Sequence, residues 1–171
     1  MALVQQNFSA YLRSLRIIFI ALLLGQVIVL GVLYFVRWQE MPEAAPIRKP
    51  WGIGFMPIIM LALPALSLSL YRKKVAAATV QPDLKSKLIA YRTALLLRWA
   101  PIEVLNLFIA VLYFVTAQAM YLYGAVIFMA VFFTLWPHRA NIVAKLGLST
   151  DEQQQLDDPH AVVAEISMRP G

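Results

Sequence analysis

Long apolar runs constrain the fold of this chain more than any other feature of its sequence. The first run extends from Ile17 to Val36 and is interrupted only by glycines, Gln26 and Tyr34. An α-helix needs roughly 20 predominantly apolar residues to cross the ~30 Å hydrocarbon core of a bilayer. This run is long enough, exceeds the apolar part of a secretory signal, and is followed by no small-residue cleavage site. We therefore interpret it as a retained transmembrane helix.

Composition points to the same environment. Hydrophobic residues make up 61% of the chain and charged residues only 14%, whereas about a quarter of the residues in a soluble domain are charged. There is no cysteine, which excludes disulfides, thiolate metal sites and cysteine nucleophiles. The two histidines, His138 and His160, lie far apart in sequence, so we expect no metal site, and we expect no cofactor.

Four apolar runs predict an all-α membrane protein with four transmembrane helices arranged as two hairpins. The spans are expected at about residues 15–37, 53–71, 93–117 and 119–136, within a transmembrane domain of residues 1–146. Residues 39–51 contain three prolines and predict a short extended loop between the first two spans.

A short amphipathic helix is expected after the last span, at residues 140–146, with Gly147 as its C-cap. Residues 147–171 are predicted to form a polar, acidic cytoplasmic tail. Within this tail, Ser149 and Glu152 have the spacing of a capping box, which predicts the start of another short helix.

Basic residues near the span ends give an orientation, because cytoplasmic loops carry an excess of Lys and Arg. Ten such residues lie on the side that holds both termini and the connection between the second and third spans, against three on the opposite side, Arg37, Arg48 and Lys49. We therefore expect a multi-pass protein of the bacterial inner membrane with both termini in the cytoplasm. Its net charge of +6 favours anionic lipid headgroups over nucleic acid as partners. The residues expected to contact headgroups are Arg72, Lys73, Lys74, Arg92 and Arg98.

Glu103 is the most informative polar residue, because it lies about 14 Å into the third span, near the bilayer centre. Asn106 follows three residues later on the same helical face, and Gln26 lies at a similar depth in the first span. A carboxylate at this depth costs at least ~2.5 kcal/mol on insertion scales, so it should face the bundle interior. We predict a buried polar cluster of these three residues. It either binds a proton or cation, or joins the helices with hydrogen bonds.

No catalytic motif occurs: HExxH, a nucleophile elbow, a phosphate-binding glycine loop and CxxC are all absent. We therefore expect no catalytic residues and no enzyme. The leading hypothesis is a structural or accessory subunit that self-associates or binds a larger membrane complex. The alternatives are a proton- or cation-conducting module built on Glu103, and a lipid-handling factor that uses Arg98 and the basic middle connection.

Several short motifs resemble those of uncharacterised small four-helix integral membrane proteins of Bacteroidetes-type bacteria. They are Gly25-Gln26 in the first span, Arg98 and Glu103 in the third, Pro137 after the fourth, and Leu146-Gly147-Leu148-Ser149 at the end of the short helix. The resemblance covers most of the chain and implies the same four-helix topology. Those proteins usually have a glycine where this chain has Val104 and an arginine where it has Trp136.

Overall fold

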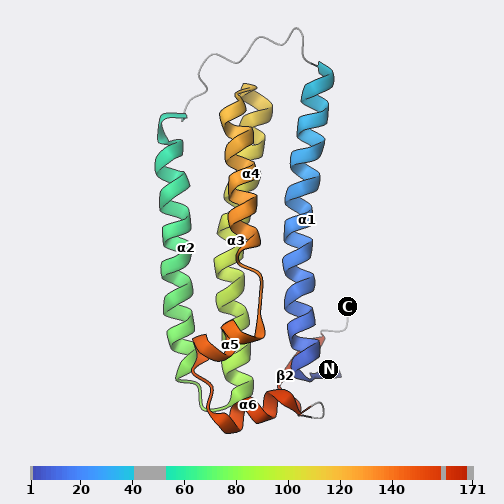
Figure 1. The fold of residues 1–171 in the computed structure, drawn as a ribbon, viewed down its shortest axis with the longest axis vertical. Coiled ribbons are helices and arrows are strands. Elements are labelled where there is room, and N and C mark those ends of the chain that lie inside the picture. Colours follow the sequence, from blue (N-terminus) through green and yellow to red (C-terminus); the bar gives the residue numbers. More distant parts are fainter. Residues whose placement is uncertain (1, 41–52, 159–160, 169–171) are drawn as a thin grey trace. The chain divides into compact units, whose positions relative to one another are not determined.

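The structure is a computed structural model that describes residues 2–40, 53–158 and 161–168. Its elements in chain order are β1 (Ala2–Gln6), α1 (Phe8–Glu40), the 3-10 helix η1 (Ile53–Phe55), α2 (Met56–Thr79), α3 (Leu84–Thr116), α4 (Ala119–Phe133), α5 (Arg139–Leu146), α6 (Thr150–Asp157) and β2 (Ala164–Met168). The helical fold that the sequence predicts is confirmed (Figure 1). The predicted loop at 39–51 lies outside the described residues from residue 41 onward.

The chain divides into two compact units. We call residues 1–19, 69–97 and 137–171 the charged unit, and residues 20–68 and 98–136 the apolar unit. Helices α1, α2 and α3 each contribute one part to each unit. The names reflect composition, since eleven of the fifteen Lys and Arg residues lie in the charged unit.

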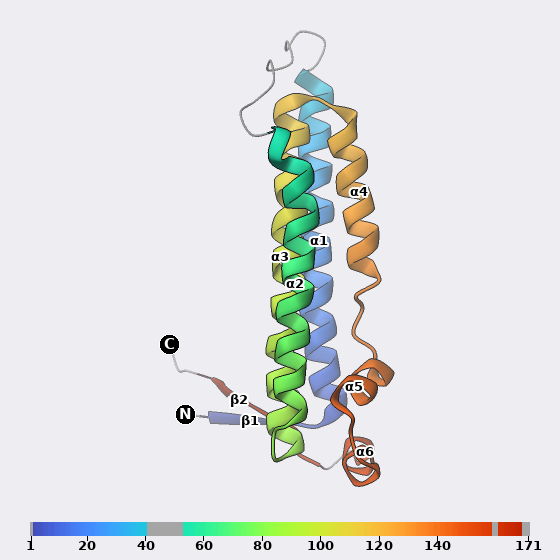
Figure 2. The same cartoon turned by 90° about the vertical axis from the view of Figure 1, so that its left-hand side faces the viewer.

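The apolar unit consists of parts of α1, α2 and α3 together with α4, which run side by side (Figures 1 and 2). Its core holds buried residues from α2, α3 and α4, and Leu30 of α1 packs against them. The buried members of this core are Met56, Leu105, Ile109, Tyr113, Tyr121 and Ala125. A Cβ built on Gly124 of α4 would make ordinary contacts, at 3.6 Å from both Ile109 and Met60.

Large apolar side chains cover much of the described exterior of the apolar unit. Among the described residues, 29 large apolar side chains are exposed, and 23 of them belong to this unit. Leu61 on α2 is 77% exposed, and Ile28 on α1 and Ile127 on α4 are 60% and 62% exposed. Apolar surface left in water costs about 25 cal/mol per Å², so a surface of this extent requires lipid or another protein.

Two of the described helices, α1 and α3, are long and apolar enough to cross a membrane, judged by length and composition. The predicted span at 15–37 falls within α1, and the one at 93–117 lies within α3 except for its last residue. The other two predicted spans correspond to shorter apolar stretches. Helix α4 has 15 residues, which is about 22 Å at 1.5 Å per residue. In α2 the apolar stretch is followed within the same helix by Arg72, Lys73 and Lys74.

The helix boundaries differ from the sequence-based expectation at the connection between α2 and α3. Helix α2 continues through its basic residues to Thr79, and α3 begins at Leu84, so the connection is only four residues long. Charged residues end an apolar run, but Lys and Arg are good helix formers and do not end a helix. Asp83 instead marks the start of α3, because its carboxylate accepts hydrogen bonds of 2.8 and 2.9 Å from the amide and hydroxyl of Ser86.

The charged unit is built around the first part of α1, the end of α2 and the start of α3, together with the C-terminal helices (Figure 2). The hydroxyl of Tyr11 on α1 donates to the carbonyl of Leu88 on α3 at 2.8 Å, in a buried position. Ile142 and Leu146 of α5 are buried, as an amphipathic helix requires. Strand β1 pairs with β2 in antiparallel register, from Ala2 opposite Met168 to Gln6 opposite Ala164. The sequence analysis did not predict these two strands.

The caps predicted in the C-terminal region are confirmed. Gly147 ends α5 in the left-handed conformation with φ of 58°, and the amide of Leu148 donates to the carbonyl of Val143. Ser149 and Glu152 form the predicted capping box at the start of α6. The carboxylate of Glu152 also accepts a 2.6 Å hydrogen bond from Lys87 of α3. Residues 147–158, predicted as a tail, thus belong to the charged unit.

Candidate functional site: a buried amide pair beside Glu103

Two amide side chains meet inside the apolar unit. Gln26 on α1 is 1% exposed and Asn106 on α3 is 3% exposed. The Nδ2 group of Asn106 donates to Oε1 of Gln26 at 2.7 Å. Equal depth in neighbouring helices brings the two residues together, as the sequence analysis expected. The bond joins α1 to α3 inside the apolar unit.

This bond stabilises the helix pair because either amide alone would be buried without a partner. An interhelical hydrogen bond in a membrane protein contributes on the order of 0.6–2 kcal/mol. Removal of one partner leaves a buried polar group unsatisfied, which costs about 1–3 kcal/mol.

One donor and one acceptor of the pair remain unused. Among the described residues, Nε2 of Gln26 and Oδ1 of Asn106 have no hydrogen-bond partner. A buried water typically satisfies such groups when two or more of them are within its reach. The amide pair thus has the capacity to hold a small polar molecule, but two of its four polar side-chain atoms already join the helices.

Glu103 lies beside the amide pair and is half-buried. Its Oε1 atom lies 3.9 Å from the position that a Cβ at Gly25 would occupy, so the carboxyl group packs against the residue preceding Gln26. No hydrogen bond joins this carboxyl group to the amides within the described part of the chain. The predicted cluster therefore consists of a bonded amide pair with a carboxyl group beside it. A group of three or more His, Cys, Asp or Glu residues suited to a metal ion does not occur among the described residues.

Arg98 takes part in a second link between helices of the apolar unit, through its backbone. The hydroxyl of Ser67 on α2 donates to the carbonyl of Arg98 on α3 at 2.8 Å, and Ser67 is fully buried. Pro101 lies three residues later in α3. The carbonyl that Pro101 leaves without its helical donor is that of Leu97, four residues back, so Ser67 bonds to the neighbouring carbonyl. This link ties α2 to α3 as the amide pair ties α1 to α3.

The other residues expected at lipid headgroups lie in the charged unit. Arg72, Lys73 and Lys74 are exposed on α2, and Arg92 is partly exposed on α3. Arg98 belongs to the apolar unit and is half-buried. The exposure of the four residues in the charged unit agrees with contact with water or headgroups.

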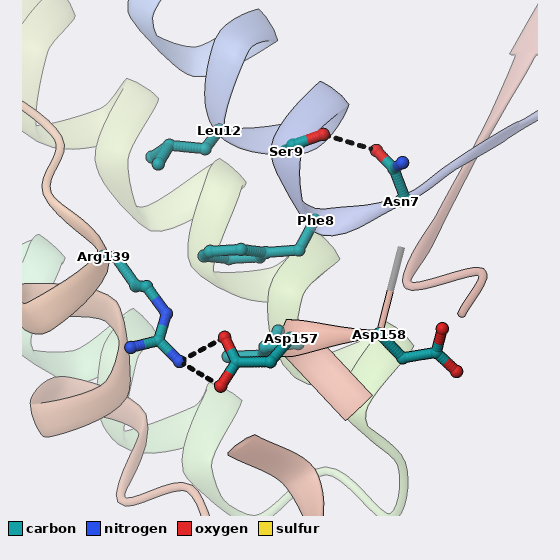
Figure 3. Close-up of a pocket in the computed structure, with 8 residues that line it drawn as sticks. Asn7, Phe8, Ser9, Leu12, Arg139, Asp157 and Asp158 are labelled. Carbon is teal, nitrogen blue, oxygen red and sulfur yellow. Dashed lines mark hydrogen bonds and ion pairs between the residues drawn. The ribbon is translucent and has the colours of Figure 1, made fainter. Parts of the chain in front are cut away.

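The charged unit contains a groove of about 320 Å³ lined by residues of α1, α5 and α6. Figure 3 shows Arg139 facing Asp157 at its edge, with the guanidinium bonded to both carboxylate oxygens at 2.7 and 2.9 Å. Phe8 and Leu12 supply apolar lining. Both charged side chains are largely exposed, and such ion pairs contribute about 0–1 kcal/mol. Because the guanidinium and carboxylate satisfy each other, we assign this groove no ligand.

Three further residues stand out in the structure that were not singled out from the sequence as site residues. Arg37, Tyr113 and Tyr121 are all buried in the apolar unit. Their apparent role in the sequence was to mark the span ends, where aromatic and basic residues are common. Burial of a guanidinium has no signal in a single sequence.

The amide pair, the carboxyl group beside it and the helix-linking serine are thus the polar interior of the apolar unit. The resemblance to small four-helix membrane proteins stays a prediction. Comparison with known proteins finds no match to a family model, to a curated protein or to a solved structure.

Proposed function

We propose that this chain is a non-enzymatic integral protein of a bacterial inner membrane that crosses the bilayer four times and serves as a structural or accessory subunit of a membrane assembly. The observation that carries the proposal is the hydrogen bond between Asn106 and Gln26. In this bond the polar side chains of the bundle interior hold helices together and do not line a path for ions or protons. The exposed apolar side chains around it supply the surface for lipid and for partner helices.

Two features support crossings by α2 and α4 as well as by α1 and α3. Exposed apolar side chains cover α2 and α4 in the apolar unit as densely as they cover α1. The short length of α4 is compatible with a crossing, because a bilayer thins locally around a short helix at a modest cost. The N-terminal segment, the α2–α3 connection and the C-terminal helices all belong to the charged unit. The positive-inside rule assigns these segments to the cytoplasm together.

The absence of cysteine from the sequence allows a clean test of the number of crossings. A cysteine at Val80, in the α2–α3 connection, and one at Gln118, between α3 and α4, are introduced separately and labelled in intact cells with a membrane-impermeant maleimide. Four crossings predict that Gln118→Cys is labelled from outside and that Val80→Cys is labelled only after lysis. Crossings by α1 and α3 alone predict the reverse pattern, which would overturn the four-helix topology.

Assembly is tested by gentle solubilisation of the tagged chain, followed by measurement of its size and identification of co-purified proteins. The proposal predicts a defined homo-oligomer or a complex with other membrane proteins. A stable monomer without partners would contradict it. The Gln26→Leu/Asn106→Leu double variant serves as a control, because it alters the interior without changing the lipid-facing surface.

A proton- or cation-conducting module is the second candidate, favoured by the position of Glu103 against Gly25 and by the unused amide atoms beside it. In proteoliposomes with an internal pH dye, this function predicts proton or cation flux that Glu103→Gln abolishes while assembly stays intact. Glu152→Gln is the matched control, since its carboxylate lies in the charged unit. Equal or absent flux in all three proteins would remove this candidate.

A further inference from the structure

Arg37 lies in the last turn of α1 and is buried in the apolar unit. That end of α1 and the α3–α4 turn lie at the same end of the unit (Figure 1). The residue is 9% exposed, and its Nε atom is buried and without a hydrogen-bond partner among the described residues. A buried guanidinium normally pairs with a carboxylate, because an unpaired charge loses its hydration without compensation. Arg37 has no ion pair within the part of the chain that the structure describes.

One tyrosine lies near this guanidinium, and a second buried tyrosine shares the core of the first. The phenol of Tyr113 on α3 lies within electrostatic range of Arg37, and its ring stacks on Tyr34 with centroids 6.3 Å apart. Tyr121 on α4 belongs to the same buried core as Tyr113, is 2% exposed, and its hydroxyl has no partner among the described residues. The unused groups of Arg37 and Tyr121 are all able to donate hydrogen bonds. A set of donors around one positive charge suits an anion with several acceptor oxygens.

The depth of the Arg37 site in the bilayer identifies the class of anion. This inference rests on the proposed membrane location. Trp38 follows Arg37 directly, is 73% exposed, and stacks on Tyr34 with centroids 6.3 Å apart. Exposed tryptophan and tyrosine at a helix end occupy the level of the lipid headgroups. The anionic group that is abundant at this level is phosphate. Arginine binds phosphate through parallel N–H groups.

We propose that Arg37, together with Tyr113 and Tyr121, binds a phosphate group at the non-cytoplasmic end of the apolar unit. The source is either the headgroup of a phospholipid or free phosphate. In both cases the phosphate oxygens accept hydrogen bonds from the guanidinium and the tyrosine hydroxyl, and the negative charge compensates the buried positive one. The bound group thereby completes the packing of α1 against α3 and α4.

The test uses the full chain purified in a non-ionic detergent that contains no phosphate. Thermal unfolding is measured alone, with phosphatidylglycerol, and with inorganic phosphate. A rise in Tm with phosphatidylglycerol only identifies the headgroup as the source, and a rise with inorganic phosphate as well identifies the free anion. Absence of a rise with either would overturn the proposal.

Variants separate binding from a merely structural role. Arg37→Met should lose the rise, with affinity reduced by about tenfold or more. Its Tm without lipid should be unchanged or higher, since it removes a buried charge that has no ion pair within the described residues. A lower Tm without lipid together with an unchanged rise would contradict the site. Arg37→Lys should restore part of the rise, and Tyr121→Phe, which keeps the ring, should reduce it. Arg13→Met is the control, because Arg13 is exposed and belongs to the charged unit.

This assay is independent of the number of crossings, which the labelling at Val80 and Gln118 measures. Failure of the phosphate site and failure of the four-helix topology are therefore distinguishable.

Discussion

The charged unit and the apolar unit place polar and apolar side chains in opposite positions. In the charged unit, apolar residues such as Leu15 and Ile142 are buried, and charged residues cover the outside. In the apolar unit, large apolar side chains cover the outside, and the polar residues Gln26, Asn106 and Ser67 are buried. In the proposed membrane location, hydrogen bonds join the helices in the region where burial of apolar surface is a weak driving force. The difference indicates that the two units are solvated differently, although three helices run through both.

The strongest test of this comparison places the same charge on the outside of each unit. Ile28→Asp changes a side chain that is 60% exposed in the apolar unit, and Ile89→Asp changes one that is 45% exposed in the charged unit. An aspartate near the middle of a span disfavours insertion by about 3 kcal/mol, whereas an exposed change in water stays within about 0.5 kcal/mol. Membrane-inserted protein, measured by resistance to alkaline extraction, should fall for Ile28→Asp and stay unchanged for Ile89→Asp. Equal behaviour of the two variants would remove the distinction between the units.

The amide pair gives the next largest effect. Gln26→Leu or Asn106→Leu should destabilise the protein by about 1–3 kcal/mol, because each leaves one buried amide unsatisfied. The double variant should regain most of that loss, since two apolar side chains replace the bonded pair. The measurement is denaturant unfolding in mixed micelles. Gln118→Leu is the control, because Gln118 is exposed. Additive losses in the double variant would show that the two amides do not act together.

Sequence patterns predicted features that depend on local spacing or on depth. The capping box of Ser149 and Glu152 and the C-cap at Gly147 follow from short-range backbone geometry, and both occur in the structure. The meeting of Gln26 with Asn106 follows from their equal distance from the span ends. In each case the relevant geometry is fixed by a helix of known rise and period.

Features that depend on packing between distant segments could not be predicted in this way. A basic triplet ends an apolar run without ending a helix, so the extension of α2 to Thr79 was not visible from hydropathy. The pairing of β1 with β2 joins segments more than 150 residues apart. Burial of Arg37 depends on which helix faces meet at one end of the apolar unit. A single sequence contains no signal for these arrangements.

Glycines in the two units differ in backbone conformation, and their replacement should have smaller effects on stability. Gly147 in the charged unit has φ of 58°, a conformation that alanine adopts only with strain, so Gly147→Ala should cost about 1 kcal/mol. Gly124 in the apolar unit is helical, and an added Cβ would make ordinary contacts at 3.6 Å. Gly124→Ala should stabilise by up to about 1 kcal/mol through helix propensity. Gly31→Ala, where no atom lies within 4 Å, controls for propensity alone. A large loss with Gly124→Ala would show tighter packing than these distances indicate.

The ion pair between Lys87 and Glu152 should give the smallest effect, and one that only the charged unit shows. The hydrogen bond from Lys87 is the main cause that lowers the pKa of Glu152 below its ordinary value of 4.5. A carboxyl group whose pKa is lower in the folded state contributes stability above its unfolded pKa and loses it as pH falls through the folded value. Glu152→Gln should therefore reduce stability by about 0.2–1 kcal/mol at pH 7. The difference in stability between Glu152→Gln and the wild-type protein should shrink below about pH 4.5, the ordinary pKa of the group.

Glu152 also accepts the amide of Ser149 in the capping box, so Lys87→Met provides the matched variant that keeps the cap. Both variants are compared by thermal unfolding between pH 7 and pH 3.5. A similar loss in Lys87→Met and Glu152→Gln assigns the effect to the ion pair between α3 and α6. A loss confined to Glu152→Gln assigns it to the helix cap instead. If the loss of stability relative to the wild-type protein persists unchanged at pH 3.5, neither the ion pair nor the cap depends on the charge of the carboxylate. The two units would then differ in packing but not in their use of charge.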